Sequence, residues 1–270
     1  MHIITNLKLN NTMEKITYII PIHQFDESIE KYLLRALESL KSLRNTETFK
    51  VMFVGPKDIL INCEKLYKNV GCTQKLDLFE IEENNLYIKI NQAVSKCVTS
   101  YFSILELDDK YYEYWNDVAQ NVIKKHNYSI IMPINEIVNT DGNIVSLMNE
   151  IAWDAAFTDE LGFIGHEELK VFKDFNVTGA YIKTDDFISC GMLKPSMKIA
   201  AWYEFLLRMV NCGYKIFISP RIGYQHTYLR EGSYMLTSQK EISIEEGKWL
   251  IEYAINDYVN KIDTNKKFEK

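Results

Sequence analysis

The sequence predicts an α/β protein with a mixed, mostly parallel sheet flanked by helices. Apolar, β-branched runs at residues 16–22, 51–54 and 103–107 are typical of parallel strands that are buried on both faces. Helical spacing of apolar residues follows the first run, over 26–40, and precedes the third, over 86–98. This alternation of strands and helices predicts helices on both faces of one sheet.

The early elements each have a local signal. Pro21 ends the first strand because it has no N–H to donate, and Asp26 is a favourable N-cap for the helix whose apolar face runs to Leu40. Gly55 and Pro56 stop the second strand. The next expected elements are a helix over 58–66, a weaker strand over 76–81 and a helix over 86–98.

The second half continues the pattern but makes the sheet mixed. Asp141-Gly142 is a strong turn signal, so a hairpin is expected around it. The other expected elements are a helix over 115–123, strands over 129–133 and 177–182, a short helix capped by Thr184, a helix over 199–210, a strand over 214–218 and a helix after Glu241. The polar run from Tyr224 to Ser233 has the composition of a mobile lid.

Length and composition indicate a soluble globular protein. The 270 residues predict one domain over 1–235, followed by a helical extension with a charged tail over 236–270. The net charge of −6 argues against a large nucleic-acid surface, although a local basic groove would not show in the sum. With no signal peptide and no apolar run of about eighteen residues, we expect a cytoplasmic protein without a membrane partner.

The five cysteines give no metal or disulfide pattern. They are odd in number, contain no C-x-x-C pair and lie within apolar stretches. This usage predicts reduced thiols in the core of a cytosolic protein.

Three carboxylates, Glu106, Asp108 and Asp109, mark the end of the strand predicted over 103–107. Ionised acids cannot follow the strand into the core, so they are expected at its carboxyl edge, where open α/β sheets bind ligands. Alternation along a strand puts Glu106 and Asp108 on one side, with Asp109 turned away or flanking. Oxygen ligands suit Mg²⁺ or Mn²⁺. A solvated turn, or a cap of the next helix, is the alternative.

Several segments together resemble the glycosyltransferases of the GT-A fold, most closely the inverting family 2 enzymes. The resemblance covers about residues 16–233, and its parts occur in the family's order, which makes it more specific than any one motif. The 203–208 and 230–233 segments also look like glycosyltransferases of tailed bacteriophages. The matching pieces are I-I-P-I-H-Q at 19–24, N-Q-A at 91–93, L-E-L-D-D at 105–109, Y-E-F-L-L-R at 203–208 and G-Y-K-I at 213–216.

The resemblance implies transfer of a sugar from a nucleoside-diphosphate sugar, expected to be a UDP-sugar, to an acceptor hydroxyl with inversion. Mn²⁺ or Mg²⁺ would be held by Glu106 and Asp108, flanked by Asp109. His226 is the candidate third ligand or diphosphate contact, and Arg230 the candidate phosphate contact. The alternatives are that His226 is a surface histidine without a ligand and that Arg230 is simply an exposed arginine.

The remaining site residues are also implied by the resemblance. Lys89 and Asn91 are expected to face the nucleotide; Pro21, His23 and Leu107 are further expected donor contacts. Glu204 is the candidate catalytic base, because partial burial between Trp202 and Phe205 would raise its pKa. Alternatively, Glu204 lies on the polar face of its helix or pairs with Arg208 at i+4.

Two departures from the family pattern bear on function. The Asp that commonly follows the second strand is replaced by Gly55-Pro56-Lys57, and the acid pair before the leucine-rich helix by Ala201-Trp202. Other classes therefore stay open: a non-catalytic sugar-nucleotide or glycan-binding module, or a nucleotidyltransferase, although residues 23–25 lack the glycines of a phosphate loop. The acceptor is open between a modified DNA base, a protein and a glycan; a phage enzyme would act in the host cytoplasm.

Overall fold

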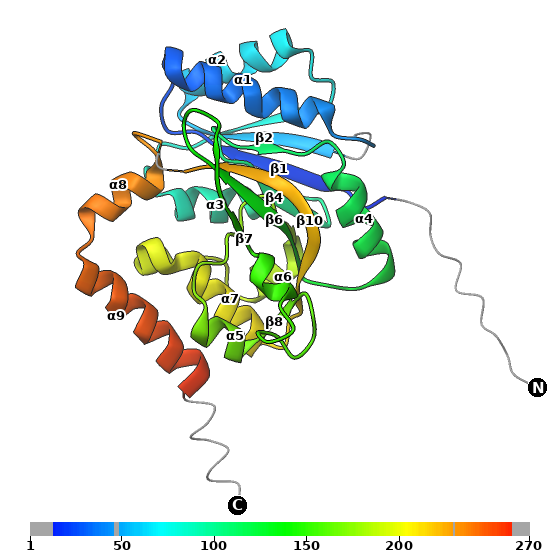
Figure 1. The fold of residues 1–270 in the computed structure, drawn as a ribbon. Helices are drawn as coiled ribbons and strands as arrows, with labels where there is room; N and C mark the ends of the chain where they lie inside the picture. The colour runs from blue at the N-terminus through cyan, green and yellow to red at the C-terminus, as the bar shows by residue number, and fades with distance from the viewer. Residues whose placement is uncertain (1–12, 46–48, 229, 261–270) are drawn as a thin grey trace, which may run out of the picture.

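The computed structural model describes residues 13–45, 49–228 and 230–260. One sheet crosses the molecule and helices cover both of its faces (Figure 1). The predicted α/β class with a mixed, mostly parallel sheet is confirmed, since the long ladders β1–β2, β2–β3 and β6–β10 are parallel.

The sheet has the strand order β3-β2-β1-β4-β9-β6-β10-β5, with β7 paired to β6 and β8 to β10. The predicted hairpin around Asp141-Gly142 is the antiparallel pair β6–β7. The strands are β1 (Ile16–Pro21), β2 (Phe49–Gly55), β3 (Lys75–Glu80), β4 (Tyr101–Ile104), β5 (Lys110–Tyr111), β6 (Ile130–Val138), β7 (Ile144–Met148), β8 (Phe163–Ile164), β9 (Tyr181–Lys183) and β10 (Ile216–Thr227).

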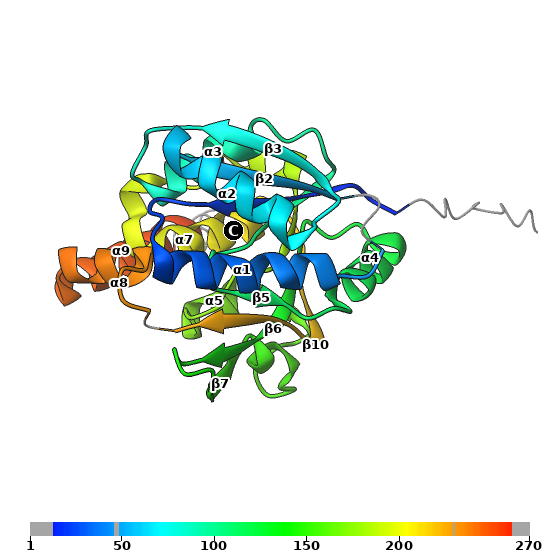
Figure 2. The ribbon, with the colours of Figure 1, turned by 90° about the horizontal axis from the view of Figure 1, so that it is seen from above.

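Helices α1 and α2 cover one face of the sheet, and Figure 2 looks down on them; α3, α7 and α9 lie on the other side (Figure 1). The helices are α1 (Glu27–Ser42), α2 (Lys57–Val70), α3 (Leu86–Val94), α4 (Trp115–Lys125), α5 (His166–Val171), α6 (Thr184–Ser189), α7 (Ala201–Asn211), α8 (Tyr234–Glu241) and α9 (Ile244–Ile255), with 3-10 turns η2 (Glu150–Trp153) and η3 (Pro195–Ala200) and a π-helical turn η4 (Asn256–Asn260).

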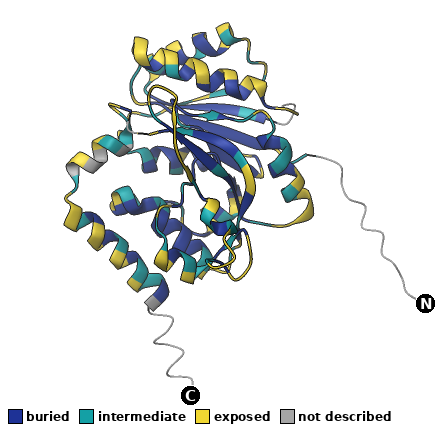
Figure 3. Cartoon of the chain, in the orientation of Figure 1, coloured by how far each residue is buried: buried dark blue, intermediate teal, exposed yellow. Residues whose placement is uncertain are grey.

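The sheet divides the apolar core in two. Its central strands, such as β1 and β4, are buried, whereas β7 is mostly exposed (Figure 3). Successive side chains of β1 point to opposite faces of the sheet. Tyr18 and Ile20 pack with the apolar side of α1, and Ile19 packs with α3 and α7. Asp26 caps α1, as predicted, by accepting hydrogen bonds from two backbone N–H groups. Helix α9 adds Leu250 and Ala254 to the α7 side of the core.

The strand that leads to the acids is shorter than predicted. Its parallel ladder with β1 ends at Ile104, and Leu105 donates one further hydrogen bond to the Ile19 carbonyl. The chain then turns, and the Asp109 N–H donates to the Glu106 carbonyl at 3.2 Å. Because residues 106–109 form a turn, strand alternation does not decide which carboxylates share a side.

The last strand is longer than predicted. After a register shift between Ile218 and Tyr224, β10 pairs with β6 again as far as Thr227. The expected lid therefore does not begin at Tyr224, and His226 lies on a strand. The irregular stretch around Pro220 hid this continuation, because proline cannot donate to a ladder.

Smaller differences concern helix ends and thiols. Helix α3 ends at Val94, four residues earlier than predicted. Thr184 does not cap α6; it is the first residue of that helix, and its hydroxyl donates to the Thr99 carbonyl. All five cysteines are free, but Cys212 is exposed, so its assignment to the core was wrong. No helix of the described part of the chain is long and apolar enough to span a membrane.

Gly179 permits the close packing of β4, β9 and β10. Its N–H donates to the Ile104 carbonyl at 3.1 Å, and its own carbonyl accepts from Trp115 Nε1 at 3.0 Å. Its φ of +78° favours glycine, and a Cβ at this position would lie 2.4 Å from the Tyr224 ring. Tyr224 can take its place beside the end of β4 only because this residue has no side chain.

We expect Gly179→Ala to lower the free energy of unfolding by about 3 kcal/mol, from overpacking plus left-handed strain. Gly142→Ala is the matched control, since Gly142 has φ +84° and nothing lies within 4 Å of its added Cβ. The control should cost about 1 kcal/mol, from strain alone. Urea denaturation midpoints measure both, and equal losses would contradict the steric account.

Candidate functional site

The acidic turn after β4 brings carboxylates together with an imidazole. Glu106, Asp109 and His226 each offer one ligand atom, and these atoms lie within 4.8 Å of one another. His226 comes from the end of β10, which runs beside β6 and β5. Two carboxylates and an imidazole form a donor set that fits a divalent transition-metal ion such as Mn²⁺.

Asp109 is the most strongly held of the three. It is 1% exposed, and its two oxygens accept hydrogen bonds from His226 Nδ1 at 2.9 Å and from the Thr227 N–H at 2.8 Å. Strand alternation predicts that Asp109 turns away from the site or flanks it. In the structure it lies inside the cluster, because the turn directs it toward β10.

Asp108 lies outside the cluster and pairs with Arg230 instead. Arg230 Nε donates to Asp108 Oδ2 at 2.6 Å, and the Thr227 hydroxyl donates to the Asp108 carbonyl at 2.7 Å. Both charged side chains are nearly buried, and the guanidinium also lies over the Tyr32 ring. The alternative of an exposed arginine is therefore wrong. The ion pair fastens the segment after β10 to the acidic turn.

Tyr224 and Thr227 hold the site and were missed by the sequence analysis. The Glu106 N–H donates to the Tyr224 hydroxyl at 3.1 Å, and Thr227 contacts both Asp108 and Asp109. Their signal was present but weak: Ile222, Tyr224 and His226 alternate with Gly223, Gln225 and Thr227, which is the period of a strand.

The crowded charges shift the proton affinities of the cluster. Burial, with the negative charge of Asp109, raises the pKa of Glu106 to about 8, although His226 and Arg230 act in the opposite direction. Burial lowers the pKa of His226, but Asp109, Glu106 and Asp108 outweigh it and raise that pKa to about 10. Burial and Asp109 also raise the pKa of Asp108. At neutral pH the cluster holds protons that a cation would displace.

We therefore expect the apparent Mn²⁺ affinity to rise at least about tenfold per pH unit between about pH 6 and pH 8, because binding must release protons. The pKa values of Glu106 and His226 are both raised, so both side chains carry a proton below those values. Each must lose its proton when the ion binds, and both effects weaken binding as the pH falls. Isothermal titration in buffers of different ionisation enthalpy measures the affinity and the protons released. A pH-independent affinity without proton release would contradict this assignment of ligands.

Basic side chains gather near the carboxyl end of β1. Lys89 of α3 is 2% exposed, and its ammonium donates to the Ile22 carbonyl at 3.2 Å. Burial lowers its pKa, partly offset by Glu83 and Glu82. His23 is exposed, and its Nε2 lies 3.4 Å from the Gly232 carbonyl. The charges of Lys89 and Arg230 both act on His23, which places the three groups near one another.

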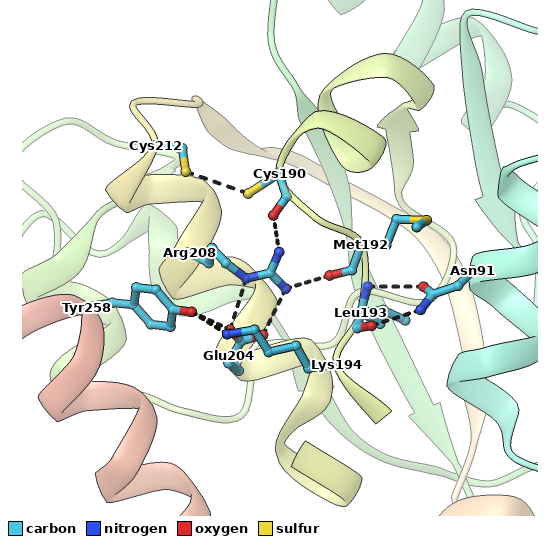
Figure 4. A network of polar contacts seen from close by, with 9 residues as sticks. All are labelled: Asn91, Cys190, Met192, Leu193, Lys194, Glu204, Arg208, Cys212 and Tyr258. Atoms are coloured by element: carbon cyan, nitrogen blue, oxygen red, sulfur yellow. Dashed lines mark hydrogen bonds and ion pairs between the residues drawn. The ribbon is translucent and has the colours of Figure 1, made fainter. Parts of the chain in front are cut away.

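The other predicted donor contacts are buried or hydrogen-bonded within the protein. Pro21 is the last residue of β1 and is buried. Leu107 is 3% exposed. The Asn91 side chain pairs with the backbone of Leu193, donating to its carbonyl at 2.8 Å and accepting from its N–H at 3.0 Å (Figure 4). Asn91 thus ties α3 to the turn that precedes η3.

Glu204 on α7 is bound within a network of ion pairs (Figure 4). Its carboxylate accepts hydrogen bonds from Arg208 Nε and Lys194 Nζ at 2.9 Å, and from the Tyr258 hydroxyl at 2.8 Å. Burial raises the pKa of Glu204, but the hydrogen bonds from Arg208 and Lys194 outweigh it and lower the pKa. The predicted rise was wrong, and the alternative pairing with Arg208 at i+4 is present.

We expect Glu204→Gln to lower the free energy of unfolding by about 3 kcal/mol, because it leaves buried Arg208 without its counter-charge. Glu246→Gln is the control: its ion pair with Lys198 is exposed, and its loss should cost less than about 0.5 kcal/mol. If Glu204 is also the catalytic base, the substitution will in addition reduce turnover of the folded protein about a hundredfold or more. Thermal denaturation and turnover assays on the same samples distinguish the two roles.

The order of strands and helices defines a class, the GT-A glycosyltransferase fold. Among solved structures, the chain is similar to residues 1–349 of Staphylococcus aureus TarS in complex with UDP-GlcNAc, with a TM-score of 0.66, 18% identity, and coverage of 91% of this chain and 67% of that one. It also matches TarS in a longer form, with a TM-score of 0.58 and 15% identity over 91% of this chain and 43% of that one.

A second glycosyltransferase shows the same fold. The mannosyltransferase PcManGT of Pyrobaculum calidifontis, in complex with GDP-Man and Mn²⁺, matches with a TM-score of 0.61 and 12% identity, over 82% of this chain and 59% of that one. At these identities the likeness establishes the fold. No family model and no curated protein matches the sequence.

Proposed function

We propose that the chain is a Mn²⁺-dependent glycosyltransferase that moves a sugar from a nucleoside-diphosphate sugar to an acceptor hydroxyl. The observation that carries this proposal is the meeting of Glu106, Asp109 and His226 at the carboxyl edge of a GT-A sheet. Two solved structures with this fold contain such donors: TarS is in complex with UDP-GlcNAc, and PcManGT is in complex with GDP-Man and Mn²⁺.

The charges beside the cluster support a diphosphate ligand. Lys89 is buried, and among the described residues no carboxylate lies within 4.0 Å of its ammonium. A buried cation without a close counter-ion favours binding of an anion. Arg230 and His23 add donors on the same side, and the acids provide a place for the cation that accompanies phosphates.

The proposed roles follow from this arrangement. Glu106, Asp109 and His226 would hold Mn²⁺, which when bound acts as a Lewis acid on the departing diphosphate. Asp108 fixes Arg230, and Arg230 and Lys89 would orient the anionic part of the donor. Mn²⁺ is proposed over Mg²⁺ because an imidazole nitrogen is a softer ligand than Mg²⁺ prefers.

The finer points of the proposal rest on the resemblance in the sequence. Inverting transfer needs a base opposite the leaving group, and Glu204 is the predicted one; its lowered pKa makes it a weak base in the geometry described. A UDP-sugar donor is proposed from the same resemblance, with UDP-bound TarS in support. A modified DNA base, in a phage setting, is the proposed acceptor.

The test is isothermal titration of nucleotide sugars with and without Mn²⁺. We expect one donor to bind only with Mn²⁺, and Asp109→Asn to abolish that binding because it removes the charge that both His226 and the ion face. Asp141→Asn, an exposed acid in the hairpin turn, is the matched control and should bind as the wild type does. Lys89→Met should weaken donor binding about tenfold or more. It should not lower the melting temperature, because it removes a charge that is costly to bury.

The same samples separate the alternative classes. Mn²⁺-dependent hydrolysis of the bound donor supports an enzyme, and binding without any turnover over a panel of acceptors indicates a binding module. Release of pyrophosphate from a nucleoside triphosphate would indicate a nucleotidyltransferase. Donor binding that is indifferent to Mn²⁺ and to Asp109 would contradict the proposed function.

A further inference from the structure

Two free thiols face each other at the carboxyl ends of α6 and α7. Cys190 is the C-cap residue of α6 and Cys212 that of α7, and their Sγ atoms are 3.9 Å apart. Figure 4 shows the two side chains directed toward one another. Cys190 is 7% exposed and Cys212 is open to solvent. A disulfide bond is about 2 Å long, so a modest movement of the exposed side chain would close the gap.

Arg208 connects this thiol pair to a turn of unusual geometry. Its guanidinium donates to the carbonyls of Cys190 and Met192, on either side of Gly191. Gly191 and Met192 have φ of +90° and +58°, so the turn holds two successive residues in the left-handed region. The next residue, Leu193, is the one that Asn91 binds through both backbone groups.

We propose that Cys190 and Cys212 form a reversible disulfide site, closed by a low-molecular-weight disulfide such as oxidised glutathione, and that closure fastens the turn between α6 and η3. Neither cysteine belongs to the metal cluster. The disulfide would join the two ends of segment 190–212, which contains η3 and α7. It would therefore restrain this segment in both the folded and the unfolded chain.

The reaction takes place by two thiol–disulfide exchanges. The exposed Cys212 thiolate attacks one sulfur of oxidised glutathione, the glutathione S–S bond breaks, and one reduced glutathione leaves. The Cys190 thiolate then attacks the Cys212 sulfur and displaces the second reduced glutathione. The two protein thiols lose two electrons and two protons, and one oxidised glutathione becomes two reduced molecules.

The second exchange needs the thiolate of a buried cysteine. Burial and the nearby Cys212 raise the pKa of the Cys190 thiol to about 12, opposed by Arg208. Once Cys212 is in the mixed disulfide it carries no thiolate charge, so one cause of this rise disappears. The rate of closure should therefore increase with pH, because the attacking species is the thiolate.

The experiment incubates the full chain with oxidised glutathione, then counts thiols after denaturation. The count should fall from five to three, and peptide mapping should place the link between residues 190 and 212. Hydrogen exchange at the amides of Met192 and Leu193 should slow about tenfold or more, because the turn opens less often. Dithiothreitol should reverse both changes.

Cys212→Ser tests the assignment with little risk to folding, since its side chain is exposed; it should keep its four remaining thiols. Cys97→Ser, a half-buried thiol elsewhere, is the matched control and should still lose two. A wild-type count that stays at five, a link between other cysteines, or a mixed disulfide at Cys212 that never resolves would each overturn the proposal.

Discussion

The site depends on one set of contacts, those that fasten the acidic turn after β4 to the end of β10. Three carboxylates within four residues repel one another, and burial adds to the cost of their charges. His226 and the Thr227 N–H hold Asp109, and Arg230 holds Asp108. These partners lie more than a hundred residues further along the chain, so the cluster exists only when β10 has taken its place beside β6.

The packing behind the cluster fixes where β10 lies. Tyr224 places its ring against Gly179 and its hydroxyl against the Glu106 N–H, and Trp115 binds the Gly179 carbonyl. Core packing therefore sets the backbone position of a candidate metal ligand. On the other face, Glu204 and Arg208 use their charges to join α7 to the turn at Met192 and to the C-terminal Tyr258. The charged residues of α7 pair with one another and with neighbouring segments, whereas Glu106, Asp109 and His226 beyond β4 bring their ligand atoms within 4.8 Å of one another.

The fold class and the acidic edge could be predicted from the sequence because both follow from local patterns. Which acids converge could not, because the end of β4 is decided by its ladder with β1, and the turn then directs Asp109 rather than Asp108 toward His226. The extent of β10 was hidden by its register shifts. The i+4 pairing of Glu204 with Arg208 was foreseen as an alternative, but Lys194 and Tyr258, which also lower its pKa, lie outside helix α7, where helical spacing gives no signal.

The most direct test of the central claim is a crystal structure of the protein soaked with Mn²⁺ and UDP, with anomalous diffraction locating the ion. The account predicts one strong anomalous peak bonded to Glu106, Asp109 and His226, with the diphosphate beside Arg230 and Lys89. It is contradicted if the peak is absent from this cluster or lies on other ligands while His226 keeps its hydrogen bond to Asp109.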